Sequence, residues 1–483
     1  MRILFVSVEV APFAKVGGLA DVAGALPKAL RRLGHDARVV MPLYRMIEDD
    51  PRWTLVNTLD EFDVEMNPHW TKTATFKETE LDGLPVGFIG TDEWYGASVN
   101  SESVYQPGGT QHLFFCQAVI AAMEQLDWIP DVIHCNDWHT GFLPVLLREK
   151  ASHVWDEVAS IYTIHNLAYQ GEFGTEVLDA LDLPHSIYNS EQVEAYGSVN
   201  FLKAGCVYSD QVNTVSKNYA NEIQTPEFGC SLEGLMAHLE RQGRLSGIVN
   251  GIDLDVFNPS TDQDLPAHFS ARAHQGKAIC RSKLLAEVGL PEIPGAPLFG
   301  VVSRLSSQKG MDLMLNAAET MFNFPIQLIV QGLGDPALAQ AFTHLEARYP
   351  QNFRFIQRFD APIAQRIYAG CDAFLMPSAF EPCGLGQMIA MRYGTVPVVR
   401  ATGGLADTVF EGKNGFRFQR RDTEDFLAAV KRARDVFQHL DQWRELMMNG
   451  MNGDYSWEKS AEEYVDVYNK ARLSRQLVGV KSA

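Results

Sequence analysis

The feature that most constrains this chain is a repeated alternation of short apolar runs with helical stretches. Runs that are apolar throughout are typical of strands buried on both faces, and helices between them are typical of parallel sheets. The sequence therefore predicts an α/β protein built from doubly wound parallel sheets. The runs are RILFVSV (2–8), DARVVMP (36–42), LPVGFIG (84–90), DVIHCN (131–136), ASIYTIHN (159–166), DQVNTVS (210–216), LFGVVSRL (298–305), IQLIVQG (326–332), FRFIQ (353–357), DAFLMP (372–377) and TVPVV (395–399).

The length of 483 residues favours more than one domain. A turn-rich polar segment, SGIVNGIDLDVFNPSTDQDLP, lies between the two sets of runs. We therefore predict a first Rossmann-like domain over 1–246 and a second over 247–460. The amphipathic stretch near the C-terminus predicts that a helix over 461–483 packs back on the first domain. In the first helix, over residues 19–33, we expect Pro27 to bend or divide the helix.

The charge and the cysteines narrow the class of protein. There are 41 basic and 60 acidic residues, a formal net charge of −19, which disfavours binding to nucleic acid or anionic membranes. No signal peptide and no run long enough to span a membrane is evident. The 7 cysteines contain no C-x-x-C pair, as expected of reduced thiols. We therefore expect a cytoplasmic enzyme.

The stretch FAKVGGLAD follows the first apolar run and precedes a helix. It is neither a G-x-G-x-x-G fingerprint nor a P-loop. Gly17 and Gly18 would let the backbone approach a ligand closely, and Lys15 would add a positive charge for an anion. The alternative is a simple glycine turn beside a solvated lysine. GGLAD recurs at 403–407, as expected if each domain has a glycine-rich turn between strand and helix.

Two segments of the second half also follow apolar runs. SRLSSQKG places Arg304 and Lys309 where they could hold two phosphates, unless both are ordinary surface charges. In PSAFEPCGLGQ, Glu381 would either cap the next helix or accept hydrogen bonds from sugar hydroxyls. The amides of residues 384–386 would face an anion.

Two polar clusters in the first half, HCNDWH and TIHNLAYQG, follow the runs at 131–136 and 159–166. The candidate ligands Asp137, His139, His165 and Asn166 lack the spacing of a zinc site, so we predict no metal site. Hydrogen bonding to a polyol, with Trp138 or Tyr169 as a stacking surface, suits these residue types. The alternative is that each histidine is an ordinary interior or rim residue.

Together these motifs resemble the bacterial glycogen synthase and plant starch synthase family, from Met1 to about Tyr468. KVGGL together with EPCGL is highly specific for it. The other matching stretches occur in family order. They are HCNDWHT, YTIHNLAYQG, VNGID, SRLSSQKG, MRYGTVPVVRATGGLADTV and the NGF of KNGF.

The resemblance implies a GT-B glycosyltransferase fold, in which two Rossmann-like domains face each other across a cleft that holds the active site. It implies transfer of glucose from ADP-glucose to the non-reducing end of an α-1,4-glucan, glycogen or a malto-oligosaccharide, with retention of configuration. It also implies that neither metal nor organic cofactor is needed. Two alternatives remain: transfer from UDP-glucose, and a non-catalytic glucan-binding scaffold.

The resemblance also assigns roles to individual residues. The catalytic set comprises Lys15, Asp137, His165, Arg304, Lys309 and Glu381. Residues of the donor site are Lys15, Gly17, Gly18, Arg304, Lys309, Phe359 (against the adenine), Cys383, Gly384, Leu385 and Gly386. Acceptor residues are Tyr95, Asp137, Trp138 and Asn166.

At two positions the chain departs from its relatives. Ile389 stands where many retaining relatives of the wider class have a second Glu, as an apolar residue often does in this family. Gly386 stands where many glycogen synthases have Thr. Because a hydroxyl is missing there, we predict weaker donor binding than in a Thr-bearing relative.

Overall fold

The computed structural model describes residues 1–482, without the side chains of Asp92, Glu102 and residues 478–482. The chain divides into two compact units. The first comprises Met1–Val215, Ala220–Ile248 and the C-terminal segment from Trp457, and the second comprises Ser216–Tyr219 and Val249–Ser456. The segment that returns to the first unit thus begins at Trp457 rather than at the predicted residue 461.

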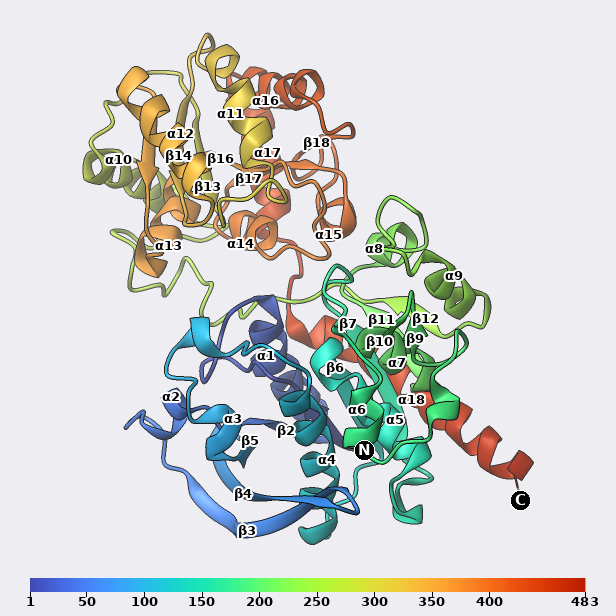
Figure 1. The fold of residues 1–483 in the computed structure, drawn as a ribbon. Coiled ribbons are helices and arrows are strands. Elements are labelled where there is room, and N and C mark those ends of the chain that lie inside the picture. The colour runs from blue at the N-terminus through green and yellow to red at the C-terminus, as the bar shows by residue number, and fades with distance from the viewer. Residues whose placement is uncertain (483) are drawn as a thin grey trace. The chain divides into compact units, whose positions relative to one another are not determined.

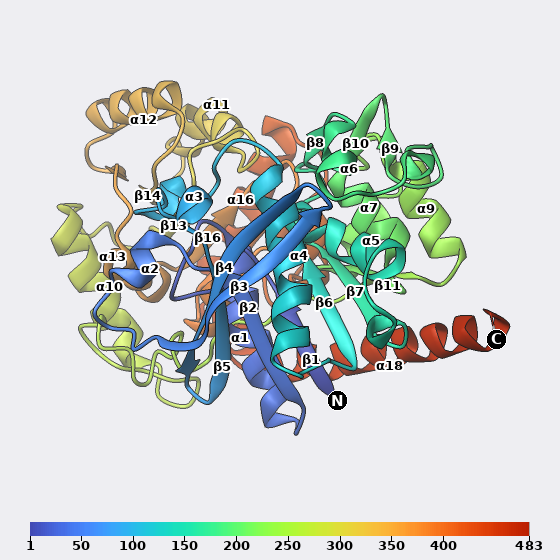
Figure 2. The same ribbon diagram turned by 60° about the horizontal axis from the view of Figure 1, so that its bottom comes forward.

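The first unit is built on one large sheet (Figure 2). Its strands β12 to β5 pair in parallel, whereas β4 and β3 form an antiparallel hairpin at one edge. This hairpin was not predicted. The order across the sheet is β12 (Leu245–Gly247), β11 (Gln211–Thr214), β7 (Ala159–Ile164), β6 (Val132–Asn136), β1 (Arg2–Val6), β2 (Asp36–Pro42), β5 (Leu84–Gly90), β4 (Trp70–Leu81) and β3 (Val56–Asn67). A small antiparallel sheet consists of β8 (Glu172–Phe173), β10 (Ser198–Asn200) and β9 (Glu194–Ala195).

Helices flank this sheet, and the last helix of the chain packs against it. α18 contacts α1, β7 and β11, and Tyr468 Oη lies 2.9 Å from His134 Nδ1 of β6. α1 is one unbroken helix through Pro27, so of the two predicted outcomes, a bend or a division, the division is wrong. The helices of the unit are α1 (Gly18–Arg32), α2 (Arg45–Glu48), α3 (Asp92–Tyr95), α4 (Thr110–Gln125), α5 (Phe142–Glu149), α6 (Glu176–Ala180), α7 (Phe201–Tyr208), α8 (Lys217–Glu222), α9 (Glu233–Arg241) and α18 (Trp457–Ser482), of which α8 begins in the segment that groups with the second unit.

The second unit is a parallel sheet in the order typical of Rossmann folds, 3-2-1-4-5-6. Its strands, in that spatial order, are β15 (Phe353–Ile356), β14 (Gln327–Gln331), β13 (Leu298–Val302), β16 (Ala373–Met376), β17 (Val396–Arg400) and β18 (Phe416–Phe418). Its helices are α10 (Gln275–Val288), α11 (Met311–Met321), α12 (Pro336–Arg348), α13 (Ala361–Gly370), α14 (Gly386–Arg392), α15 (Gly403–Thr408), α16 (Thr423–Phe437) and α17 (Leu440–Met451) (Figure 1).

In both sheets the strand order reverses beside the first strand. The reversal lies between β1 and β6 in the first unit, and between β13 and β16 in the second. Open α/β sheets bind ligands at the carboxyl ends of the strands where the order reverses. All four of these strands run into segments that the sequence analysis singled out: KVGG after β1, Asp137 after β6, Arg304 after β13 and Glu381 after β16.

The core of the second unit contains a buried lysine. Lys277 Nζ donates to Ala369 O at 2.9 Å, Tyr393 O at 3.0 Å and Thr395 Oγ1 at 2.7 Å. These acceptors tie α10 to the ends of α13 and α14. Burial lowers the pKa of Lys277 to about 8, although the negative charge of Asp372 opposes the shift.

We predict that Lys277 makes stability depend on pH above neutrality. Between about pH 8 and 10.5 the unfolded chain keeps the lysine proton that the folded chain has released, so the free energy of unfolding rises with pH. The slope would be at most about 1.4 kcal/mol per pH unit. Urea unfolding of wild type and Lys277→Met at pH 7 to 10 measures it, because other titrations cancel in the difference. Parallel curves for the two proteins would contradict the prediction.

Candidate functional site

A pocket of about 210 Å³ opens at the strand-order reversal of the second unit. It lies between the segment that follows β13 and the turn that follows β16. The polar residues that line it are Ser303, Arg304, Lys309, Tyr368, Ser378 and Glu381, and residues 384–386 complete the wall. Of the residues predicted for the donor site, this pocket brings together Arg304, Lys309, Gly384, Leu385 and Gly386, beside the predicted catalytic Glu381.

An ion pair occupies one side of this pocket. Lys309 Nζ donates to Glu381 Oε1 at 2.8 Å and to Oε2 at 2.7 Å, and Ser378 Oγ donates to Oε2 at 3.0 Å. Glu381 is only 6% exposed, so the carboxylate is oriented by three hydrogen bonds. Arg304, in contrast, is exposed and makes no ion pair with any residue that the structure describes. The guanidinium is therefore available to an anionic ligand.

Close backbone packing positions Lys309 beside the end of β16. The next residue, Gly310, has φ +74°, and a Cβ there would lie 2.0 Å from Pro377 O. Ala379 N also donates to Gln308 O at 2.7 Å. Only glycine permits this approach, so the SRLSSQKG segment is fixed against the strand that leads to Glu381.

The second GGLAD stretch, at residues 403–407, packs its backbone directly against the Glu381 turn. A Cβ at Gly403 would lie 1.8 Å from Glu381 O, and one at Gly404 would lie 2.1 Å from Cys383 O. Gly404 N donates to Glu381 O at 3.1 Å. Cys383 is 5% exposed and lies outside the set of lining residues. Burial raises the pKa of its thiol to about 12, which suits a packing role.

In the first unit the KVGG loop is held by a residue that the sequence analysis missed. Glu9 is 2% exposed, and its Oε2 accepts hydrogen bonds from Val16 N at 2.6 Å and Gly17 N at 2.8 Å. Tyr105 donates to the other oxygen. The amide of Gly17 is thus already occupied. The only available signal was a glutamate inside an apolar run, directly after the first strand.

The two glycines of this loop face open space. A Cβ added at Gly17 or Gly18 would meet no atom within 4 Å, and neither residue has a positive φ. The fold of the described chain therefore does not require glycine at either position. Lys15 lies beside them, is 53% exposed and pairs with Asp21 at 2.6 Å.

Asp137 follows β6 at the same reversal and has an unusual conformation. Its φ is +55°, which is uncommon for a residue other than glycine. Its Oδ1 accepts from His165 N at 2.8 Å. Burial, with a further contribution from the charge of Glu9, raises the pKa of Asp137 to about 7, although amide donors oppose the shift. Strain and a shifted pKa together are typical of functional residues.

His165 is held by its neighbours on β6. Its Nε2 lies 2.9 Å from Asn136 Oδ1, and burial lowers its pKa to about 3, so the ring is neutral at physiological pH. The next residue, Asn166, uses its side-chain oxygen to accept from Ala168 N at 3.1 Å. The structure thus groups Asp137, His165 and Asn166 at one edge of the sheet.

Three predicted residues remain, of which Trp138 directly follows Asp137. Tyr95 is 4% exposed and donates to Gln111 O at 3.1 Å, so it belongs to the core rather than to an acceptor site. The Trp138 ring packs against His139 and Phe173 instead of standing open as a stacking surface. Phe359 is 79% exposed, in the loop before α13, and does not line the pocket of the second unit.

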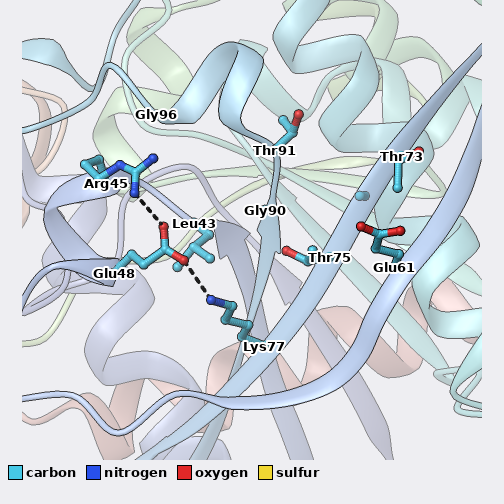
Figure 3. Close-up of a pocket in the computed structure, with 11 residues that line it drawn as sticks. Leu43, Arg45, Glu48, Glu61, Thr73, Thr75, Lys77, Gly90, Thr91 and Gly96 are labelled. Atoms are coloured by element: carbon cyan, nitrogen blue, oxygen red, sulfur yellow. Dashed lines mark hydrogen bonds and ion pairs between the residues drawn. The ribbon is translucent and has the colours of Figure 1, made fainter.

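Another pocket, of about 290 Å³, lies in the first unit, between the β3–β4 hairpin and α2. Figure 3 shows Glu48 between Arg45 and Lys77, which donate to its carboxylate at 3.3 Å and 2.7 Å. None of the predicted site residues lines it. Its charges already compensate one another, so we assign it no ligand.

Among the side chains that the structure describes, no group of three or more His, Cys, Asp or Glu residues is arranged to hold a metal ion. No helix in the described chain combines the length and apolar character needed to cross a bilayer.

Comparisons with known proteins agree with this geometry. Residues 2–238 match the starch synthase catalytic domain, and residues 296–435 match glycosyl transferases group 1. Glycogen synthases of Moorella thermoacetica and Syntrophotalea carbinolica are 43% and 42% identical, covering 99% and 98% of this chain and 98% and 99% of their own. The catalytic domain of starch synthase IV from Arabidopsis thaliana, solved with ADP and acarbose, superposes with a TM-score of 0.88 at 31% identity, covering 98% of this chain and 99% of its own. The chain therefore belongs to the glycogen synthase and starch synthase family of GT-B glycosyltransferases.

Proposed function

We propose that this enzyme transfers glucose from ADP-glucose to the non-reducing end of an α-1,4-glucan, with retention of configuration. The observation that carries the proposal is the pocket beside β13 and β16, where unpaired Arg304 adjoins the Lys309–Glu381 ion pair. Such a pocket offers positive charge to a diphosphate and a carboxylate to sugar hydroxyls. The relative from Arabidopsis thaliana was solved with ADP and acarbose, which supports a nucleotide and a glucan as ligands.

Each residue then has a distinct role. Arg304 and Lys309, together with Lys15 and Gly18 of the first unit, would stabilise the charge that develops on the departing diphosphate. Glu381 would hold the glucose hydroxyls, and neutral His165 would lie against the donor sugar. Asp137 would orient the incoming acceptor hydroxyl. Phe359 would stack on the adenine, and its exposure leaves the ring free to do so.

We propose a front-face reaction for the chemical step. The bond between glucose C1 and the diphosphate oxygen breaks as the acceptor 4-hydroxyl attacks from the same face. Its proton passes to an oxygen of the departing phosphate. Ile389 lines the pocket where a second carboxylate would otherwise stand, so no nucleophile is provided at that position.

We further propose that the reaction needs no metal or organic cofactor, because basic side chains would supply the positive charge.

We also propose that the enzyme is cytoplasmic. All seven cysteines are free thiols, including exposed Cys230, which suits a reducing compartment.

Incorporation of labelled glucose into glycogen tests the proposal. Purified enzyme would be given ADP-glucose or UDP-glucose, each with and without a chelator. We expect incorporation from ADP-glucose that the chelator leaves unchanged. Preference for UDP-glucose would overturn the donor assignment, and loss of activity with chelator would overturn metal independence. Glycogen binding without incorporation from either donor would identify a scaffold.

Replacement of Glu381 tests the pocket itself. We expect Glu381→Ala to lower kcat about 10²–10³-fold, by analogy with the loss of one preorganised transition-state contact. Ser378→Ala serves as the milder control, because it removes one hydrogen bond to the carboxylate and leaves the Lys309 pair intact. Circular dichroism would verify folding. Wild-type turnover by folded Glu381→Ala would contradict the role.

Gly18→Ala tests whether glycine in the KVGG loop is needed for ligand binding rather than for folding. Because the added methyl group meets no atom of the unit and Gly18 begins a helix, we expect stability to be unchanged or to rise by up to about 1 kcal/mol. If the donor passes close to this backbone, its KM rises several-fold at the same time. Unchanged kinetics would show that the ligand does not approach Gly18.

The pKa of Asp137 predicts the acidic limb of the pH profile. If Asp137 acts as a carboxylate, kcat/KM falls as pH drops below about 7. Glu9→Gln keeps an oxygen for the loop amides but removes a negative charge facing Asp137, so we expect the limb to move to lower pH. Neighbouring His165 and Tyr105 stay neutral in this range, since burial lowers the pKa of the first and raises that of the second.

Asp82→Asn is the matched control for that experiment. It removes a carboxylate at the turn between β4 and β5, where Asp82 pairs with Lys28 at 2.6 Å. We expect its pH profile to coincide with that of wild type. An identical limb for Glu9→Gln and wild type would show that Asp137 does not govern the profile.

A further inference from the structure

Tyr368, on α13, carries a hydroxyl that the structure leaves without a partner. The side chain lines the pocket of the second unit and the residue is only 7% exposed. Its hydroxyl makes no hydrogen bond with any residue that the structure describes, and its oxygen is not among the side-chain atoms shut off from solvent, so it is open to the pocket. Burial raises the pKa of Tyr368, so the group stays a neutral O–H donor at working pH.

Packing alone does not account for this hydroxyl. The Tyr368 ring packs against Phe374 with centroids 4.9 Å apart, and a phenylalanine ring would pack equally well. The hydroxyl reaches solvent through the pocket, so a ligand oxygen can replace water as its acceptor. Tyr368 lines the same pocket as Arg304 and Lys309. A ligand bound there would therefore accept the hydrogen bond that the hydroxyl does not make to the protein.

Gly386 leaves the space that this hydroxyl uses. A Cβ at residue 386 would lie 3.4 Å from Tyr368 Oη and 3.3 Å from Phe374 Cε1. The tyrosine hydroxyl therefore stands within reach of the place where a threonine at 386 would carry its own. The sequence analysis predicted that the missing side chain costs a ligand contact, but the structure provides a hydroxyl from a different helix.

We propose that Tyr368 is a donor-binding residue that hydrogen-bonds an oxygen of the nucleotide-sugar diphosphate, replacing the hydroxyl that residue 386 lacks. This inference rests on the proposed function, since it takes the pocket to be the diphosphate site. A neutral phenol suits this role because it donates to an anionic oxygen without adding charge to the Lys309–Glu381 pair. Loss of the hydroxyl should therefore weaken ligand binding and leave stability unchanged.

Tyr368→Phe is the test, with the Kd for ADP measured by calorimetry and the melting temperature measured without ligand. We expect ADP to bind about tenfold more weakly, the effect of one hydrogen bond to a charged group. The melting temperature should be unchanged, because the hydroxyl makes no hydrogen bond to the described protein and the ring keeps its packing against Phe374. The KM for glycogen should not change. A purely structural role would lower the melting temperature instead.

Tyr393→Phe is the matched control. Tyr393 is fully buried in the same unit, and its hydroxyl donates to Asp262 Oδ2 at 2.5 Å, outside the pocket lining. We expect this variant to melt at a lower temperature and to bind ADP as wild type does. The reversed pattern between the two tyrosines distinguishes a ligand contact from a structural one.

Gly386→Ser in the Tyr368→Phe background provides a rescue. A serine at 386 returns a hydroxyl to the same wall of the pocket, so we expect most of the lost ADP affinity to return. Wild-type ADP affinity in Tyr368→Phe, while Arg304→Ala weakens binding, would overturn this inference and leave the proposed function standing. Failure of the wild-type chain to bind ADP would overturn both.

Discussion

Reversal of strand order in a parallel sheet is the constraint on which this molecule depends. Successive crossover helices cover opposite faces of the sheet on the two sides of a reversal, so the carboxyl ends of two adjacent strands stay uncovered there. The chain uses this arrangement twice. KVGG and Asp137 follow the strands at one reversal, and Arg304 and Glu381 follow those at the other. Polar groups that are distant in sequence are therefore placed at the same end of the sheet by the strand order alone.

The two GGLAD stretches show how one short sequence serves two physical purposes. At residues 403–404 the glycines allow the backbone to touch the Glu381 turn, and any side chain would collide with it. At residues 17–18 nothing in the folded chain fills the space beside them. The first pair of glycines is thus dispensable for packing, whereas the second is required by it. Sequence similarity alone cannot distinguish these cases, because the difference lies in what approaches each backbone.

Much of the fold could be predicted because strands buried on both faces leave continuous apolar runs. The β3–β4 hairpin was missed for the converse reason: β3 buries Phe62, Val64 and Met66 but exposes the residues between them, so no such run exists. In the site, Arg304, Lys309 and Glu381 were predicted from their positions after strands and from the family resemblance. Glu9 and Tyr368 were not, since neither stands in a recognised motif: Glu9 acts because the KVGG loop folds back on its carboxylate, and Tyr368 because α13 lies beside the pocket.

The C-terminal helix has a consequence for how the chain is made. α18 covers α1 and β7, and Tyr468 meets His134 at a sequence separation of 334 residues. The second unit is encoded almost entirely between these partners. During synthesis, the first unit must therefore wait on the ribosome with one apolar face uncovered until the last segment emerges. The second unit has no such dependence, so the half translated later is the one free to complete its folding first.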